Sequence, residues 1–107
     1  MASAYINAKV DLTGTSPVVL YTAPSITTAI ITSILVSEDS GSSDTITVTL
    51  TNAAAAVFSL FKVKAVSANT TVELLTRPLV VAEAEIIKVT AATGGRLHVV
   101  ASLLELS

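Results

Sequence analysis

A run of eight residues, 44–51 (DTITVTLT), alternates apolar side chains with threonine. Successive side chains of a β-strand point to opposite faces of the sheet. The run therefore predicts a strand with one dry, apolar face and one face of hydroxyl and methyl groups. A protein that stands alone in water usually carries Lys and Glu on its wet face, whereas this face is neutral.

Similar patterns recur through the rest of the chain, and no long helical stretch interrupts them. Pro24 and Pro78 mark strand ends, because proline has no N–H to give to a ladder. Short strands at this spacing predict an all-β fold, an antiparallel two-sheet β-sandwich that is jelly-roll-like, with about seven or eight strands. The further segments predicted as strands are 18–21, 29–37, 57–64, 69–76, 79–81, 85–91 and 96–106.

Two connections have the composition of hairpin loops. The polar loop 38–43 (EDSGSS) and the dipeptide Gly94-Gly95 each follow one predicted strand and precede the next. Both predict that the strands they join pair with each other. Segment 29–37 is partly apolar on both of its faces, which predicts a central strand that is covered on two sides.

Residues 18–107 are predicted to form a single β-sandwich domain, which suits a chain of 107 residues. Residues 1–17 mix small, polar and single apolar side chains, with Gly14 and Pro17 at the end. They fit either an N-terminal arm that lies on a neighbouring subunit or a first strand. The sequence leaves both alternatives open.

Charged residues make up 13% of the chain, against roughly 25% in ordinary soluble domains, and the net charge is −2. Little charge repulsion keeps copies apart, which predicts a Ser- and Thr-rich surface and self-association. The absence of Cys excludes a disulfide framework. Only six scattered Lys and Arg residues are present, so we expect no nucleic-acid partner. Prolines interrupt the uncharged stretch 12–37 and no signal-peptide pattern is seen, so we expect no membrane partner.

Few residues carry the chemistry of an active site. His98 is the one histidine and lies within a predicted strand. Ser is abundant and no G-x-S-x-G motif is present, so a packed or surface side chain explains His98 better than a catalytic triad. Glu38, Asp39 and Asp44 could offer oxygens to a hard cation such as Ca²⁺. Their spacing is not that of an EF-hand, and a solvated loop explains them.

Three other motifs have structural explanations. Glu83 and Glu85 suit the rim of a strand better than a catalytic carboxylate pair. Gly94-Gly95 is a turn, since it has neither the phosphate-loop motif nor a helix after it. The third motif consists of two phenylalanines and two lysines, Phe58, Phe61, Lys62 and Lys64. Core phenylalanines and rim lysines explain it better than a platform for stacking nucleic-acid bases does. We therefore expect no catalytic, cofactor-binding or metal-binding residue, no cofactor and no enzymatic activity.

Several stretches together resemble small virion structural proteins of tailed bacteriophages. The resemblance covers about residues 18–106 and is moderately specific. It implies a β-sandwich that coats or joins a particle, with two placements: a capsid decoration (cement) protein on the head, which we expect, or a tail or tail-fibre component. The stretches are VLYTAP at 19–24, TAIITSILVS at 28–37, ANTTVELLTRPLV at 68–80 and LHVVASLLE at 97–105.

A cement protein binds between capsid subunits and stabilises the head, so the expected location is the virion, on the capsid surface. The expected partners are the major capsid protein and other copies of the chain, as a homotrimer. From another class, a carbohydrate-binding module would need aromatic platforms, and the chain has no Trp and two Tyr residues. The residues expected at an interface are Tyr5, Ile6, Val10, Thr47 and Thr49.

Overall fold

The computed structural model describes residues 3–107, which form nine β-strands and no helix. The strands are β1 (Ser3–Leu12), β2 (Val18–Thr22), β3 (Thr28–Glu38), β4 (Asp44–Thr51), β5 (Val57–Val66), β6 (Thr71–Glu73), β7 (Leu79–Val81), β8 (Ile86–Ala91) and β9 (Leu97–Leu106). The predicted all-β class is confirmed. The structure has one strand more than expected, because β1 lies within residues 1–17. For that segment the sequence had left two alternatives, an arm or a first strand.

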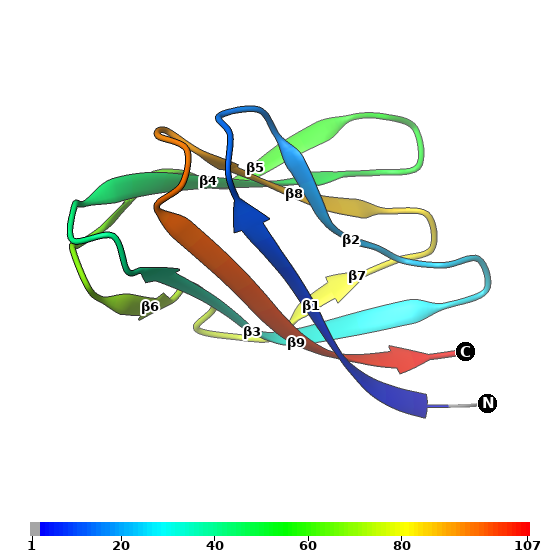
Figure 1. Ribbon diagram of the computed structural model, residues 1–107. Coiled ribbons are helices and arrows are strands. Elements are labelled where there is room, and N and C mark those ends of the chain that lie inside the picture. Colours follow the sequence, from blue (N-terminus) through cyan, green and yellow to red (C-terminus); the bar gives the residue numbers. More distant parts are fainter. Residues whose placement is uncertain (1–2) are drawn as a thin grey trace.

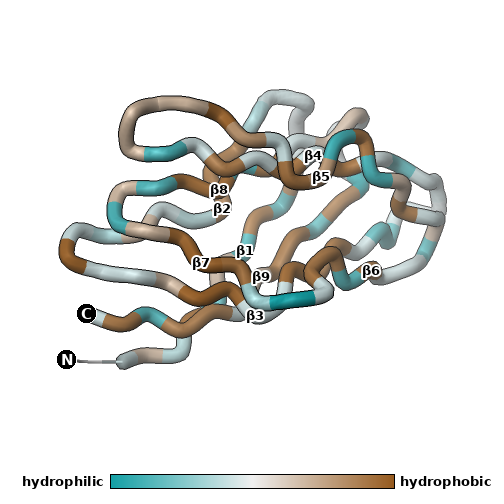
Figure 2. Tube along the Cα trace, turned by 180° about the vertical axis from the view of Figure 1, so that it is seen from behind, coloured by the Kyte–Doolittle hydropathy of each residue, from teal (hydrophilic) through white to brown (hydrophobic). Residues whose placement is uncertain are grey.

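The strands form two antiparallel sheets that face each other (Figure 1). Sheet A has the order β1-β9-β3-β6, and β7 also pairs with β3. Sheet B has the order β2-β8-β4-β5. The core lies between the sheets and consists mainly of Val, Ile, Leu and Ala. Figure 2 shows apolar stretches of β3, β7 and β9 close together in sheet A. This arrangement confirms the antiparallel two-sheet sandwich.

Two of the short connections cross from one sheet to the other. β3 lies in sheet A and β4 in sheet B, while β8 lies in sheet B and β9 in sheet A. The hairpins predicted at loop 38–43 and at Gly94-Gly95 are therefore wrong. A hairpin instead joins β4 to β5. Its turn is held by Asn52, whose side-chain oxygen accepts hydrogen bonds from the backbone N–H groups of Ala54 (3.0 Å) and Ala56 (2.9 Å).

Strand β4 has the alternation that its sequence predicts. Ile46 and Val48 are fully buried, whereas Thr47 and Thr49 lie half-buried on the outer face of sheet B. The hydroxyl of Thr47 also accepts a hydrogen bond from the backbone N–H of Val63 at 3.1 Å. The threonine face therefore stabilises the neighbouring edge strand as well as facing outward. Across residues 3–107 we find no helix of the length and apolarity needed to cross a membrane.

Candidate functional site

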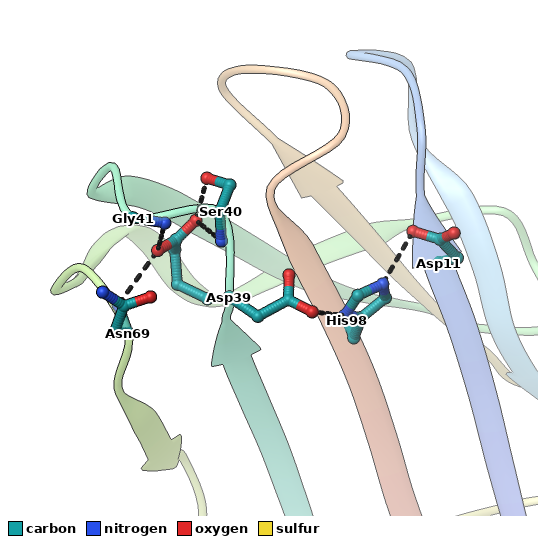
Figure 3. A network of polar contacts seen from close by, with 7 residues as sticks. Asp11, Asp39, Ser40, Gly41, Asn69 and His98 are labelled. Atoms are coloured by element: carbon teal, nitrogen blue, oxygen red, sulfur yellow. Dashed lines mark hydrogen bonds and ion pairs between the residues drawn. The ribbon is translucent and has the colours of Figure 1, made fainter.

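The acidic loop that offered a possible cation site serves the fold instead. Glu38 is buried at the end of β3, and its carboxylate accepts hydrogen bonds from the backbone N–H groups of Ser40 (2.9 Å), Gly41 (3.1 Å) and Asn69 (3.0 Å). The Ser40 hydroxyl donates another. Figure 3 shows these donors around the carboxylate. The Ser40 hydroxyl and then the backbone donors lower the pKa of Glu38 to about 2, although burial opposes this shift.

Replacing this carboxylate is expected to destabilise the fold in a pH-dependent way. The pKa of Glu38 falls from its ordinary value of 4.5 to about 2 on folding, so its contribution is complete above about pH 4.5 and is lost as the pH falls through 2. Glu38→Gln should therefore lower the melting temperature by several degrees at pH 7, and the difference from wild type should shrink below pH 4.5. Melting curves from pH 2 to pH 7 test this. A similar loss in Asp39→Asn, an exposed charge of the same loop, would contradict it.

Other carboxylates also accept hydrogen bonds from backbone N–H groups or from a hydroxyl group. Asp44 accepts from Thr93 at 3.1 Å, and Glu73 accepts from Ile34 at 2.8 Å. Glu85 accepts from the backbone of Ala82, Glu83 accepts from that of Ile26, and Glu105 accepts from the hydroxyl of Tyr21. Within residues 3–107, no group of three or more His, Cys, Asp or Glu side chains could hold a metal ion. These acidic side chains thus hold loops and strands together through hydrogen bonds.

His98 lies between two carboxylates on the outer face of sheet A (Figure 3). Its Nε2 is 3.2 Å from Oδ1 of Asp11 on β1, and its Nδ1 is 3.6 Å from Oδ2 of Asp39 in the β3–β4 loop. All three side chains are at least 43% exposed. Exposed contacts of this kind contribute little to stability, and these connect the edge strand β1 to the rest of the sheet.

The outer face of sheet A carries a row of apolar side chains that crosses four strands. Tyr5 of β1 lies opposite Leu104 of β9, Leu104 opposite Ile30 of β3, and Ile30 opposite Val80 of β7. Sequence neighbours of Leu104, Ile30 and Val80 point into the core, so these three side chains point outward; Leu103, for example, is 2% exposed. Tyr5 shares their face through its pairing with Leu104. Tyr5 is 88% exposed and Val80 58% exposed. We call this set the apolar row.

A second, mixed row runs parallel to the apolar row. It places Lys9 opposite Val100, Val100 opposite Leu35, and Leu35 opposite Glu73. Leu35 is 40% exposed and Val100 is 37% exposed.

Asn7, Ser102 and Ser33 lie between the two rows, so the outer face of sheet A carries two exposed apolar patches with a polar strip between them. Exposed apolar patches commonly mark surfaces where proteins bind other proteins. We call this face the apolar face of sheet A. This face is the best candidate functional site.

The residues expected at an interface fall on three different surfaces. Tyr5 lies in the apolar row, whereas Ile6 and Val10 point to the opposite side of β1. Val10 packs against the core there, and Ile6 is 36% exposed. Thr47 and Thr49 lie on the outer face of sheet B. The structure therefore does not bring the five together into one site.

The other members of the apolar face were not predicted as interface residues. Segment 29–37 did carry a signal for them, because both of its faces are partly apolar. Its two apolar faces predicted a strand covered on both sides. In the structure the core covers one side of β3, while Ile30 stays half-buried and Leu35 exposed on the other. Nothing within residues 3–107 forms a third layer over that face.

Comparison with known proteins gives a fold and no family. No family model matches the chain, and no curated protein matches it. Among solved structures, a chain from the disulfide-linked pili of Bacillus endospore appendages has a TM-score of 0.60 at 6% identity, covering 99% of this chain and 87% of that one. A chain of infectious bursal disease virus, Gt strain, has a TM-score of 0.45 at 8% identity, covering 98% and 30%. The first likeness shows a shared fold.

Proposed function

We propose that this chain is a structural subunit without enzymatic activity, built into a virion as a capsid decoration (cement) protein. The observation that carries the proposal is the uncovered apolar face of sheet A. Its apolar row crosses four strands without a charged residue, and Leu35 and Val100 add a second apolar patch beyond a polar strip. A low charge content and the resemblance to phage virion proteins support the same function. The fold shared with a pilus subunit also suits a protein that works by assembly.

The apolar face of sheet A would bind the major capsid protein between shell subunits. Burial of Tyr5, Leu35 and Val80 against the shell would supply the main favourable free energy. Lys9 and Glu73 at the ends of the mixed row would provide the polar rim that such interfaces have. Copies linked into one oligomer would contact the shell at several points, which raises the overall strength of attachment. The chain has no cysteine, so disulfide linkage of the kind found in the pili is closed to it.

The polar side chains support a role without catalysis. An active site needs converging polar groups that are free to bind and react with a substrate. Here Glu38, Asp44 and Glu73 are occupied by backbone N–H groups, and His98 is flanked by carboxylates on an open surface. The alternative placement, in a tail or tail fibre, would use the same apolar face on a different partner.

Charges placed on the apolar face should weaken attachment to the particle. The double variant Leu35→Asp/Val80→Asp would bury unpaired carboxylates at the contact, and we expect at least about tenfold weaker binding. The matched control, Val19→Asp/Val57→Asp, adds the same charge at exposed valines of sheet B. Co-sedimentation of labelled protein with particles from a phage that lacks the gene measures the binding. Equal binding by the two double variants would contradict the proposal.

A further inference from the structure

Most sheet edges in this fold carry features that prevent pairing with another strand. In sheet B, the edge strand β5 has two register shifts against β4, and Val63 within it has a φ of 53°. Lys62 and Lys64 add charge to the same edge. Bulges, twisted backbone and lysines are the common means by which proteins block an exposed edge.

The other edge of sheet B and the far edge of sheet A are blocked in different ways. β2 has five residues, a register shift between Val19 and Tyr21, and prolines at 17 and 24 beyond its ends. β6 and β7 have three residues each, and Pro78 lies between them. Short strands and prolines offer few backbone groups to a partner.

Strand β1 is the least protected of these edges. It has ten residues, and its register with β9 runs without a shift from Ser3 to Leu12. It contains neither proline nor glycine, and its first six residues, Ser3 to Ala8, carry no charge, whereas Lys9 and Asp11 lie in its last four. Among residues 3–107, no strand pairs with its other side. Its outer N–H and C=O groups are thus open to a further strand over most of its length. At its end, the carbonyls of Asp11 and Leu12 accept hydrogen bonds from Thr13 (3.0 Å) and Gly95 (2.8 Å).

We infer that β1 pairs in antiparallel fashion with β1 of a second copy of this chain. Among the described residues a copy has four sheet edges, and its own β1 is the edge with the fewest blocking features. The contact is therefore isologous and has two-fold symmetry. Two sheets A then form one continuous sheet across the dimer, with both apolar rows on the same side.

Charge and length place the two-fold axis at Asn7. In this register Tyr5 lies opposite Lys9 of the second copy, and Ser3 lies opposite Asp11, so nine residues pair and no like charges meet. The Lys9 ammonium, which donates a hydrogen bond to Oδ1 of Asn7 at 3.2 Å, would also lie near the ring of Tyr5 of the second copy. An axis at Lys9 would oppose two lysines and shorten the pairing. An axis at Ala8 would pull in Leu12, whose side chain is fully buried and whose carbonyl accepts from Gly95 at 2.8 Å.

This contact makes a dimer, in place of the homotrimer expected from the resemblance. The paired strands bury less surface than the ~1,600 Å² of a typical stable complex, so the free dimer is weak and forms at micromolar concentration. Its use for particle binding rests on the proposed function: two apolar rows side by side would bind the shell as one wide surface. The pairing itself does not depend on what the apolar row binds.

A single cysteine at the axis tests the pairing, because the chain has no other thiol. In Asn7→Cys the two sulfurs would face each other, and mild oxidation should give a disulfide-linked dimer. In Tyr5→Cys, on the same face of the same strand, the two cysteines would lie about 13 Å apart, beyond the ~7 Å that a disulfide can bridge. We expect at least about tenfold more crosslinked dimer from Asn7→Cys. Equal crosslinking, no crosslinking, or a trimer mass in light scattering would overturn the inference.

A charge at the axis gives an independent measurement. Asn7→Asp would place two carboxylates opposite each other and should raise the dimer dissociation constant at least about tenfold at low salt. The control Thr22→Asp adds the same charge at an exposed position of sheet B and should leave dimerisation unchanged. Analytical ultracentrifugation measures both, and equal constants would overturn the pairing. Leu35→Asp/Val80→Asp should still dimerise, so failure of the proposed function and failure of the pairing give different results.

Discussion

Leu12→Ala is expected to destabilise the protein by about 2–5 kcal/mol, the usual cost of removing a fully buried leucine side chain. Leu12 ends β1, is 0% exposed, and packs in the core between the two sheets. The substitution would leave a cavity and loosen the end of β1 that the core holds. Denaturant unfolding at low protein concentration, where the monomer dominates, measures the effect.

Tyr5→Ala is the matched control for Leu12→Ala. It removes a larger side chain from the same strand, but Tyr5 is 88% exposed. We expect a change within about 0.5 kcal/mol, as for most surface substitutions. If Leu12→Ala were equally mild, β1 would be a detachable arm, and the residues before Pro17 would not contribute to the domain core.

Gly94→Ala is expected to destabilise the fold by about 1–3 kcal/mol through overpacking. The turn between β8 and β9 crosses from sheet B to sheet A and passes directly over the β1–β2 loop. A Cβ on Gly94 would lie 2.4 Å from the carbonyl oxygen of Thr13 and 3.2 Å from Cα of Gly14. Both are backbone atoms, so no side chain can rotate away, and one of the two loops must move.

Gly14→Ala provides the control for Gly94→Ala in the facing loop. A Cβ there meets no atom within 4 Å, so its effect should stay within about 0.5 kcal/mol. Denaturant unfolding of the two variants gives the comparison. Equal effects would mean that the two loops do not pack as closely as the structure shows.

Local patterns in the sequence predicted the strands well, because alternation is a property of a single segment. The run 44–51 is strand β4 with its apolar face buried, as predicted. Strand pairing was harder. The loop 38–43 and Gly94-Gly95 have the composition of hairpin turns, yet each connects the two sheets. A turn within one sheet and a connection between two sheets can have the same composition. Only the packing of the whole chain decides which strands pair.

The candidate site could not be predicted for a related reason. The apolar row combines residues 5, 30, 80 and 104, and only the register of four separate strands brings them together. The acidic residues mislead in the opposite direction. Glu38 and Asp44 are close in sequence and suggest a cation site, but their partners are amides of loops near Asn69 and Thr93. No sequence pattern marks a carboxylate that binds a distant backbone N–H.

The proposed function is tested most directly by locating the chain on native particles. Antibodies raised against the purified protein, with gold labels, can be applied to intact phage from the lysate that produces it and imaged by electron microscopy. We expect gold over the outer surface of the heads, at many copies per particle. Gold confined to tails would contradict the cement assignment in favour of a tail component. Absence of gold from particles that still contain their major capsid protein would contradict a structural role in the virion.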